Sequence, residues 1–130
     1  MIIVMVMSLA AFSQTAEAKK LTIVAFGDSI TAPRKGVVTY SDILREILSS
    51  KNAEVINAGI GGNTTEHAKK RFEKDVLAKS PDLVIIQFGN NDSAVDVWKD
   101  PPATGPRVPV ADYVNNLSEM IATLKARKAK

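Results

Sequence analysis

The stretch LTIVAFGDS, residues 21–29, decides the fold of this chain. Leu21 to Phe26 is a short run of apolar and β-forming residues, which predicts a buried strand. A glycine, an aspartate and Ser29 follow at once, so the strand ends in a small polar turn. A serine there exposes its hydroxyl and holds its backbone N–H near the start of a helical turn, which favours a negatively charged oxygen. Serine is also a common helix N-cap, so this motif alone leaves both roles open.

Two more strands that end in polar, glycine-bearing turns follow along the chain. The hydrophobic periodicity predicts three strands and three helices that alternate, with a proline-rich loop (98–109) before the last helix. This order predicts a parallel sheet with helices on both faces, and such sheets bind ligands at the carboxyl ends of their strands. The expected strands are 21–26, 53–57 and 82–88, and the expected helices are 36–49, 64–79 and 110–127.

Composition limits the classes of function. The chain has 130 residues, 45% hydrophobic and 24% charged, with a net charge of +3, which are ordinary values for one globular domain. Its basic residues are spread out apart from a cluster within 125–130, and no arginine-rich stripe with aromatics appears, which argues against a nucleic-acid partner. The absence of cysteine and the single histidine argue against a zinc site and exclude a cysteine nucleophile. We expect no cofactor and no metal.

The N-terminus predicts export. Residues 2–12 are mostly apolar, and Ala16-Glu17-Ala18 follows shortly before Lys19. An apolar core followed by a small-x-small site is typical of a secretory signal, although no basic residue precedes the core. Eleven residues are too few to span a bilayer, which takes about 20. We therefore expect a signal peptide over residues 1–18, a domain over residues 19–130, and a secreted or periplasmic protein.

Three residues of the turns form a set that acyl transfer requires. Ser29 offers a hydroxyl, Gly62 a backbone N–H that no side chain shields, and Asn91 a side-chain NH₂. Each also has an ordinary structural role, as a helix cap, a tight turn or an asparagine bonded to its own backbone. All three lie at the same predicted sheet edge, which favours a nucleophile with donors for an oxyanion.

These motifs resemble the first three conserved blocks of the SGNH, or GDSL, esterases and lipases. The blocks are Gly27-Asp28-Ser29, residues 57–64, and Gly89-Asn90-Asn91-Asp92. The resemblance implies a flavodoxin-like three-layer α/β/α sandwich and ester hydrolysis without a cofactor. It implies that Ser29 is the nucleophile and that the Ser29 amide, the Gly62 amide and the Asn91 side chain form the oxyanion hole. Asp28 and Asp92 would order the loops around the serine.

The chain departs from the family in the fourth block. The family carries an Asp-x-x-His pair near its C-terminus, and this sequence has none. His67 is its single histidine, three residues after Thr64, and we interpret it as a solvated helix residue. We therefore expect an N-terminal part of a longer esterase, truncated after the third strand and the following helix, with a fourth strand beginning within 126–130. Such a fragment would be inactive by itself.

Two functions of other classes compete with hydrolysis. One is a non-catalytic binding module on the same scaffold, and the other is a flavodoxin-like binder of phosphate or flavin. Asp28 and Asp92 at the pocket mouth disfavour a phosphate dianion. For an esterase we expect a small-molecule or carbohydrate ester as the partner, for instance an acetylated sugar. The loop from Trp98 to Pro109 is either a rim of the pocket or a plain spacer.

Overall fold

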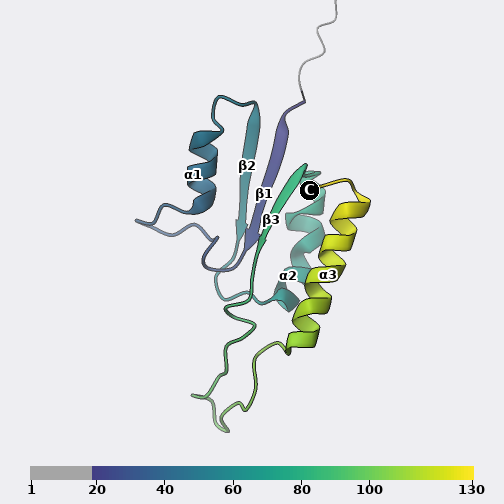
Figure 1. Ribbon diagram of the computed structural model, residues 1–130. Coiled ribbons are helices and arrows are strands. Elements are labelled where there is room, and N and C mark those ends of the chain that lie inside the picture. Colours follow the sequence, from purple (N-terminus) through teal and green to yellow (C-terminus); the bar gives the residue numbers. More distant parts are fainter. Residues whose placement is uncertain (1–18) are drawn as a thin grey trace, which may run out of the picture.

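A computed structural model describes residues 19–130, so the predicted signal peptide lies outside the described residues. The described chain forms an α/β fold with a three-stranded parallel sheet between two helical layers (Figure 1). Helix α1 covers one face, and α2 and α3 cover the other, as the predicted sandwich requires. The elements are β1 (Leu21–Gly27), α1 (Tyr40–Ile47), β2 (Ala53–Gly59), α2 (Thr65–Asp75), a 3₁₀ turn (Leu77–Lys79), β3 (Leu83–Gln87) and α3 (Val110–Ala126).

The sheet brings the three predicted turns to one edge. Its order is β2-β1-β3, so the strand that carries the Gly-Asp-Ser turn is central. Gly27, the last residue of β1, pairs with Gly59 on β2 and with Gln87 on β3. The three strands therefore end at the same level, and the segments that follow them leave from neighbouring positions.

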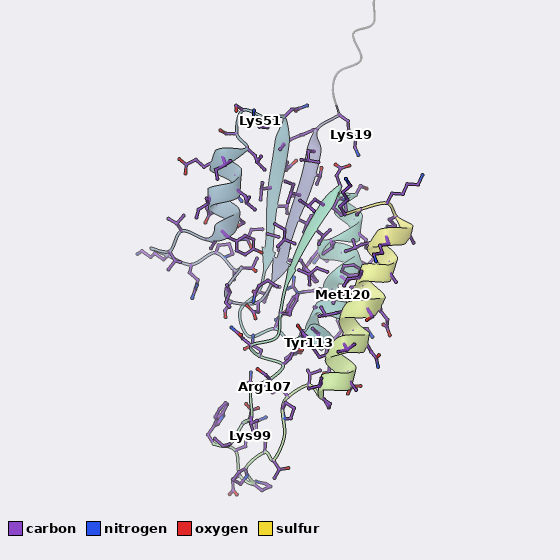
Figure 2. All side chains as sticks on the ribbon, viewed as in Figure 1. Lys19, Lys51, Lys99, Arg107, Tyr113 and Met120 are labelled. Carbon is purple, nitrogen blue, oxygen red and sulfur yellow. The ribbon has the colours of Figure 1, made fainter. Side chains whose placement is uncertain are left out.

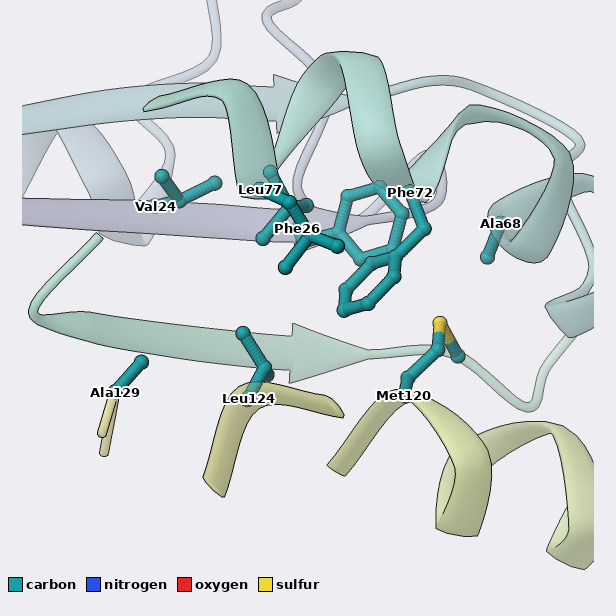
Figure 3. Close-up of a cluster of buried hydrophobic side chains, with 9 residues drawn as sticks. Val24, Phe26, Ala68, Phe72, Leu77, Met120, Leu124 and Ala129 are labelled. Carbon is teal, nitrogen blue, oxygen red and sulfur yellow. The ribbon is translucent and has the colours of Figure 1, made fainter. Parts of the chain in front are cut away.

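The core lies between the sheet and the α2–α3 layer (Figure 3). Phe26 is fully buried at its centre, with its ring centroid 5.8 Å from Phe72 and 5.2 Å from Phe88. The residues predicted as the core face of the second helix are all buried: Ala68, Phe72, Val76 and Leu77. This packing fixes α2, whose N-terminus begins beside the turn that follows β2.

Helix α1 begins four residues later than expected. Gly36 has a φ of +76°, a left-handed conformation that glycine adopts easily, and Arg34 and Val37 form an isolated bridge. Thr39 then caps the helix: its backbone N–H donates to Asp42 Oδ2 (2.9 Å). The predicted apolar face of this helix is only partly buried, because Ile43 and Ile47 are 48% and 65% exposed.

The apolar stripe predicted on α3 is also only partly buried. Met120 and Leu124 pack in the core, whereas Val110, Val114 and Ile121 stay exposed. Strand β3 is half-buried along its whole length, although its unbroken apolar sequence predicted cover on both faces. It is an edge strand. In the described chain α1 packs over β2, which lies at the opposite edge of the sheet.

The last residue pairs with the outer edge of β3. Lys130 donates its backbone N–H to Asp82 O (2.9 Å) and accepts from Val84 N–H at 2.8 Å, which is the parallel pattern. This is the edge at which the sequence predicted a fourth strand. No helix within residues 19–130 is long and apolar enough to cross a membrane.

Candidate active site at the carboxyl edge of the sheet

The turn after β1 holds Ser29 in a fixed place. The carbonyl of Asp28 accepts the backbone N–H of Thr31 (3.2 Å) and of Ala32 (2.9 Å), so one helical turn follows the strand, as predicted. The Asp28 carboxylate accepts the Ile30 N–H at 2.9 Å. Asp28 is fully buried, whereas Ser29 keeps part of its surface in water. The aspartate therefore shapes the turn and leaves the serine hydroxyl accessible.

Two glycines allow this turn to lie directly against the sheet. A side chain at Gly27 would collide with the hydroxyl of Thr31, and one at Gly59 would collide with the backbone of Ala32. Two residues further on the space opens, because a Cβ at Gly61 would lie 3.8 Å from Ser29 Cβ, an ordinary contact. The turn after β2 thus lies beside Ser29 without crowding it.

The turn after β2 is also linked to the turn after β3. Asn63 N–H donates to Ile60 O (3.4 Å), and Gly62 between them has a φ of +76°, the left-handed value that the third residue of a type II turn needs. Asn91 Nδ2 donates one hydrogen to the carbonyl of Asn63 at 2.9 Å. An amide NH₂ carries two hydrogens, and among residues 19–130 the Asn63 carbonyl is the one acceptor that Asn91 Nδ2 contacts. The structure therefore places the three turns that carry Ser29, Gly62 and Asn91 next to one another.

Arg71, on α2, bonds to the ends of β1 and β2 and to the turn after β2. Its guanidinium donates to Gly27 O (2.9 Å), to Ala58 O (2.8 Å) and to Asn63 Oδ1 (2.8 Å), and it pairs with Asp75. It also stacks over the ring of Phe26, 4.4 Å from the centroid. The side chain is only 12% exposed. Sequence reasoning missed Arg71, because nothing in the helical pattern separates it from its solvated neighbours.

Asn57 and Asp92 complete the same layer. Asn57 Nδ2 donates to Thr31 O and to Ser41 Oγ, both at 2.7 Å, and its Oδ1 accepts the Gly59 N–H. Asp92 Oδ1 accepts the backbone N–H of Thr65 at 2.8 Å and also its hydroxyl, so it anchors the start of α2. We call Asp28, Asn57, Arg71 and Asp92 the floor of the site, and Ser29, Gly62 and Asn91 its rim.

The single histidine, His67, is hydrogen-bonded to the residue that caps α2. Nδ1 of His67 accepts the backbone N–H of Thr64 (3.2 Å) and lies 2.9 Å from its hydroxyl. The residue is exposed, as predicted, but it is bonded to the helix cap as well as solvated. Within residues 19–130 no hydrogen bond joins His67 to Ser29.

One other ionisable group lies close to the floor. Burial raises the pKa of the Tyr40 hydroxyl above 10.0, its hydrogen bond with Thr31 offsets part of this, and the negative charge of Asp28 adds to it. Tyr40 therefore stays protonated at neutral pH. In the described part of the chain, no group of three or more His, Asp or Glu side chains could hold a metal ion.

Comparison with known proteins shows which family this chain resembles. The profile of the GDSL-like lipase/acylhydrolase family matches residues 25–130. An uncharacterized lipoprotein of Bacillus subtilis, YqeF, is 43% identical over 81 residues, which are 56% of this chain and 32% of that protein. An acetylxylan esterase of Geobacillus stearothermophilus is 40% identical over 65 residues, or 49% of this chain and 28% of the enzyme.

A solved structure agrees with the sequence matches. The lipase/acylhydrolase from Enterococcus faecalis superposes with a TM-score of 0.67 at 35% identity, covering 84% of this chain and 54% of that one. The chain thus spans about a third of the length of the two curated relatives and about half of the solved structure. The profile match covers most of the chain, and the fold agrees with it: the chain belongs to the GDSL-like lipase/acylhydrolase family.

Proposed function

We propose that this chain carries the nucleophile and the oxyanion hole of a serine esterase. One observation supports the proposal above all: Gly61 lies against Ser29, and the Asn91 side chain is bonded to Asn63, so that the three turns meet. In the proposed reaction, Ser29 Oγ attacks the ester carbonyl and its proton passes to a base. The N–H groups of Ser29 and Gly62 and the Asn91 amide stabilise the oxyanion. The alcohol leaves, and water then hydrolyses the acyl-serine.

The base is the missing part of this proposal. His67 is a poor candidate because its Nδ1 is bonded to the Thr64 cap, and the 130 residues contain no Asp-x-x-His. Triad enzymes that lack a member retain only about 10³–10⁴-fold acceleration over water. We therefore expect this chain alone to hydrolyse esters very slowly.

We propose short acyl esters of carbohydrates as the substrate class. A relative that is named an acetylxylan esterase supports this choice. We further propose that residues 1–18 direct the chain out of the cytoplasm. The sequence pattern and a relative that is named a lipoprotein support export.

A fluorophosphonate probe tests the nucleophile directly. Ser29 Oγ would displace fluoride from phosphorus, and imidazole added to the buffer would accept the proton in place of the missing base. Mass spectrometry of the full chain should find the label on Ser29, at a rate that rises with imidazole. Ser93, an exposed serine in the third turn, is the internal control and should stay unlabelled.

The competing binding module predicts a different result. If Ser29 reacts no faster than Ser93 in folded protein, with or without imidazole, the nucleophile proposal is wrong. The non-catalytic role on the same scaffold then becomes the better account. Ser29→Ala should remove the imidazole-dependent label altogether and so confirms its position.

A further inference from the structure

A polar pocket shares a wall with the rim of the site. Gly62 and His67 line one side of it, and Asp96, Lys99 and Arg107 line the other. Its volume is about 440 Å³, enough for a sugar unit or two. Gly62 belongs both to the rim and to this pocket, and its neighbour Gly61 lies against Ser29, so a ligand in the pocket would lie beside the turn that faces the serine.

The loop that forms the far side of this pocket is held in a defined shape. Asp96 is buried and accepts from Arg107 Nε (2.8 Å), Arg107 Nη2 (2.7 Å) and Lys99 Nζ (2.7 Å). Backbone bonds from Arg107 N to Ala94 O and from Val108 N to Asp92 O pair the two arms of the loop. The bonds to Arg107, and then to Lys99, lower the pKa of Asp96, so it stays ionised at neutral pH. A plain spacer would not need such an anchor.

This loop presents the single tryptophan of the chain to water. Trp98 is 69% exposed, and the Arg107 guanidinium stacks against its ring, 5.8 Å from the centroid. Figure 2 shows Lys99 and Arg107 on the part of the loop that projects beyond the carboxyl ends of the strands. The ring of Trp98 thus lies against Arg107 and next in sequence to Lys99, both of which line the polar pocket.

The chemistry of the pocket fits a neutral sugar better than an anion or an acyl chain. An indole face packs against the C–H face of a pyranose, while carboxylate, guanidinium and imidazole groups bond its hydroxyls. Both cations already donate to Asp96, so an anionic ligand would have to compete with that carboxylate. An acyl chain fits instead the separate apolar pocket of about 570 Å³ that Val95, Val108 and Tyr113 line.

We infer that the pocket between Gly62 and Arg107, with Trp98 at its edge, binds the sugar part of the ester substrate as a neutral pyranose. This inference rests on the proposed esterase function, because it places the alcohol side of the scissile ester next to Ser29. On this inference, the loop from Trp98 to Pro109 selects which sugar esters the site binds.

The fluorescence of Trp98 provides the test, since the chain has no other tryptophan. Titration of the full chain with xylotetraose should change its emission in a saturable way, and calorimetry should give the same affinity. Trp98→Ala should weaken binding by about tenfold in calorimetry, and Trp98→Phe should recover part of the loss. Ile47→Ala, an exposed apolar change on α1 away from the pocket, should bind like the parent chain.

The outcomes separate this inference from the proposed function. If no sugar binds while Ser29 is still labelled by the fluorophosphonate, the sugar pocket is wrong and the esterase proposal stands. If Trp98-dependent binding is present but Ser29 is not labelled, the esterase proposal fails and the sugar site stands. Binding that is equal in Trp98→Ala overturns the inference, and so does tighter binding of tetragalacturonate or inorganic phosphate.

Discussion

The polar atoms of the floor bond mainly within the protein, whereas those of the rim are partly exposed to water. In the floor, Asn57 and Arg71 bond in several directions, and Asp28 and Asp92 each use one carboxylate oxygen. The other oxygens of these two carboxylates are buried without a partner among the described residues. In the rim, the Ser29 side chain is partly in water and the Gly62 amide lies in an exposed turn.

This difference indicates separate roles for the floor and the rim. Donors that stabilise an oxyanion act best when they are already oriented before the reaction, and bonds behind them supply that order. The floor therefore contributes to stability and the rim to chemistry. Substitutions in the floor should therefore lower the free energy of unfolding by more than those in the rim do.

The largest expected effect on stability comes from two glycines that lie two residues apart. Gly59→Ala should lower the free energy of unfolding by at least about 3 kcal/mol, because its methyl group would meet the backbone of Ala32. Gly61→Ala, in the turn next to the rim residue Gly62, should change it by no more than about 0.5 kcal/mol, since the new Cβ would be at contact distance from Ser29. Urea unfolding measures both. Equal losses would contradict the close approach of the Ser29 turn to Gly59 and the open space at Gly61.

Arg71 should have the next largest effect. Arg71→Met removes one donor from each of the Gly27 and Ala58 carbonyls and leaves Asp75 without its ion-pair partner, which should lower the free energy of unfolding by about 2–3 kcal/mol. Lys69→Met on the same helix is the matched control. Lys69 makes one exposed ion pair with Glu119, so its loss should amount to less than about 1 kcal/mol. A neutral Arg71→Met would contradict the role that we give to the floor.

A smaller effect on the free energy of unfolding is expected from pH. It arises at the start of α1, where Ser41 accepts a hydrogen bond from the floor residue Asn57. Bonds from the Thr39 backbone and hydroxyl, and then from Arg45, lower the pKa of Asp42 from 3.8 to about 2. The stabilisation by this carboxylate is thus complete above pH 3.8 and is lost as the pH falls through about 2.

Asp42→Asn isolates this contribution. Between pH 4 and pH 2, roughly the two ends of the shift, the parent chain should lose more stability than the variant does. Urea midpoints of both proteins across that range provide the comparison. Parallel curves would show that the Thr39 cap does not depend on the charge of Asp42.

The sheet and its three turns could be predicted from sequence because they follow from local patterns. Apolar runs that end in glycine and polar residues indicate buried strands, and the β-α alternation indicates a parallel sheet. The predicted start of α1 was wrong because Gly36 adopts a left-handed conformation, so the helix begins only after the Thr39 cap. Apolar spacing could not show how deeply Ile47 and Val114 are buried, since burial depends on which elements pack nearby.

The floor could not be predicted in the same way. Arg71 and Asn57 act through backbone carbonyls of residues distant in sequence, and no local signal marks such contacts. Trp98 was recognised only as part of a proline-rich loop, because its stacking on Arg107 depends on the Asp96 anchor. The roles of Ser29, Gly62 and Asn91 stay predictions that the geometry supports.

The rate at which Ser29 reacts with a fluorophosphonate in Asn91→Ala tests the central claim most directly. If Asn91 donates to the oxyanion, imidazole-assisted labelling should slow by about 10²–10³-fold, with little change in the free energy of unfolding. Asn90→Ala, at the exposed neighbouring position, should react like the parent chain. Equal rates in folded Asn91→Ala and Asn90→Ala would contradict the assignment of the rim as an oxyanion hole.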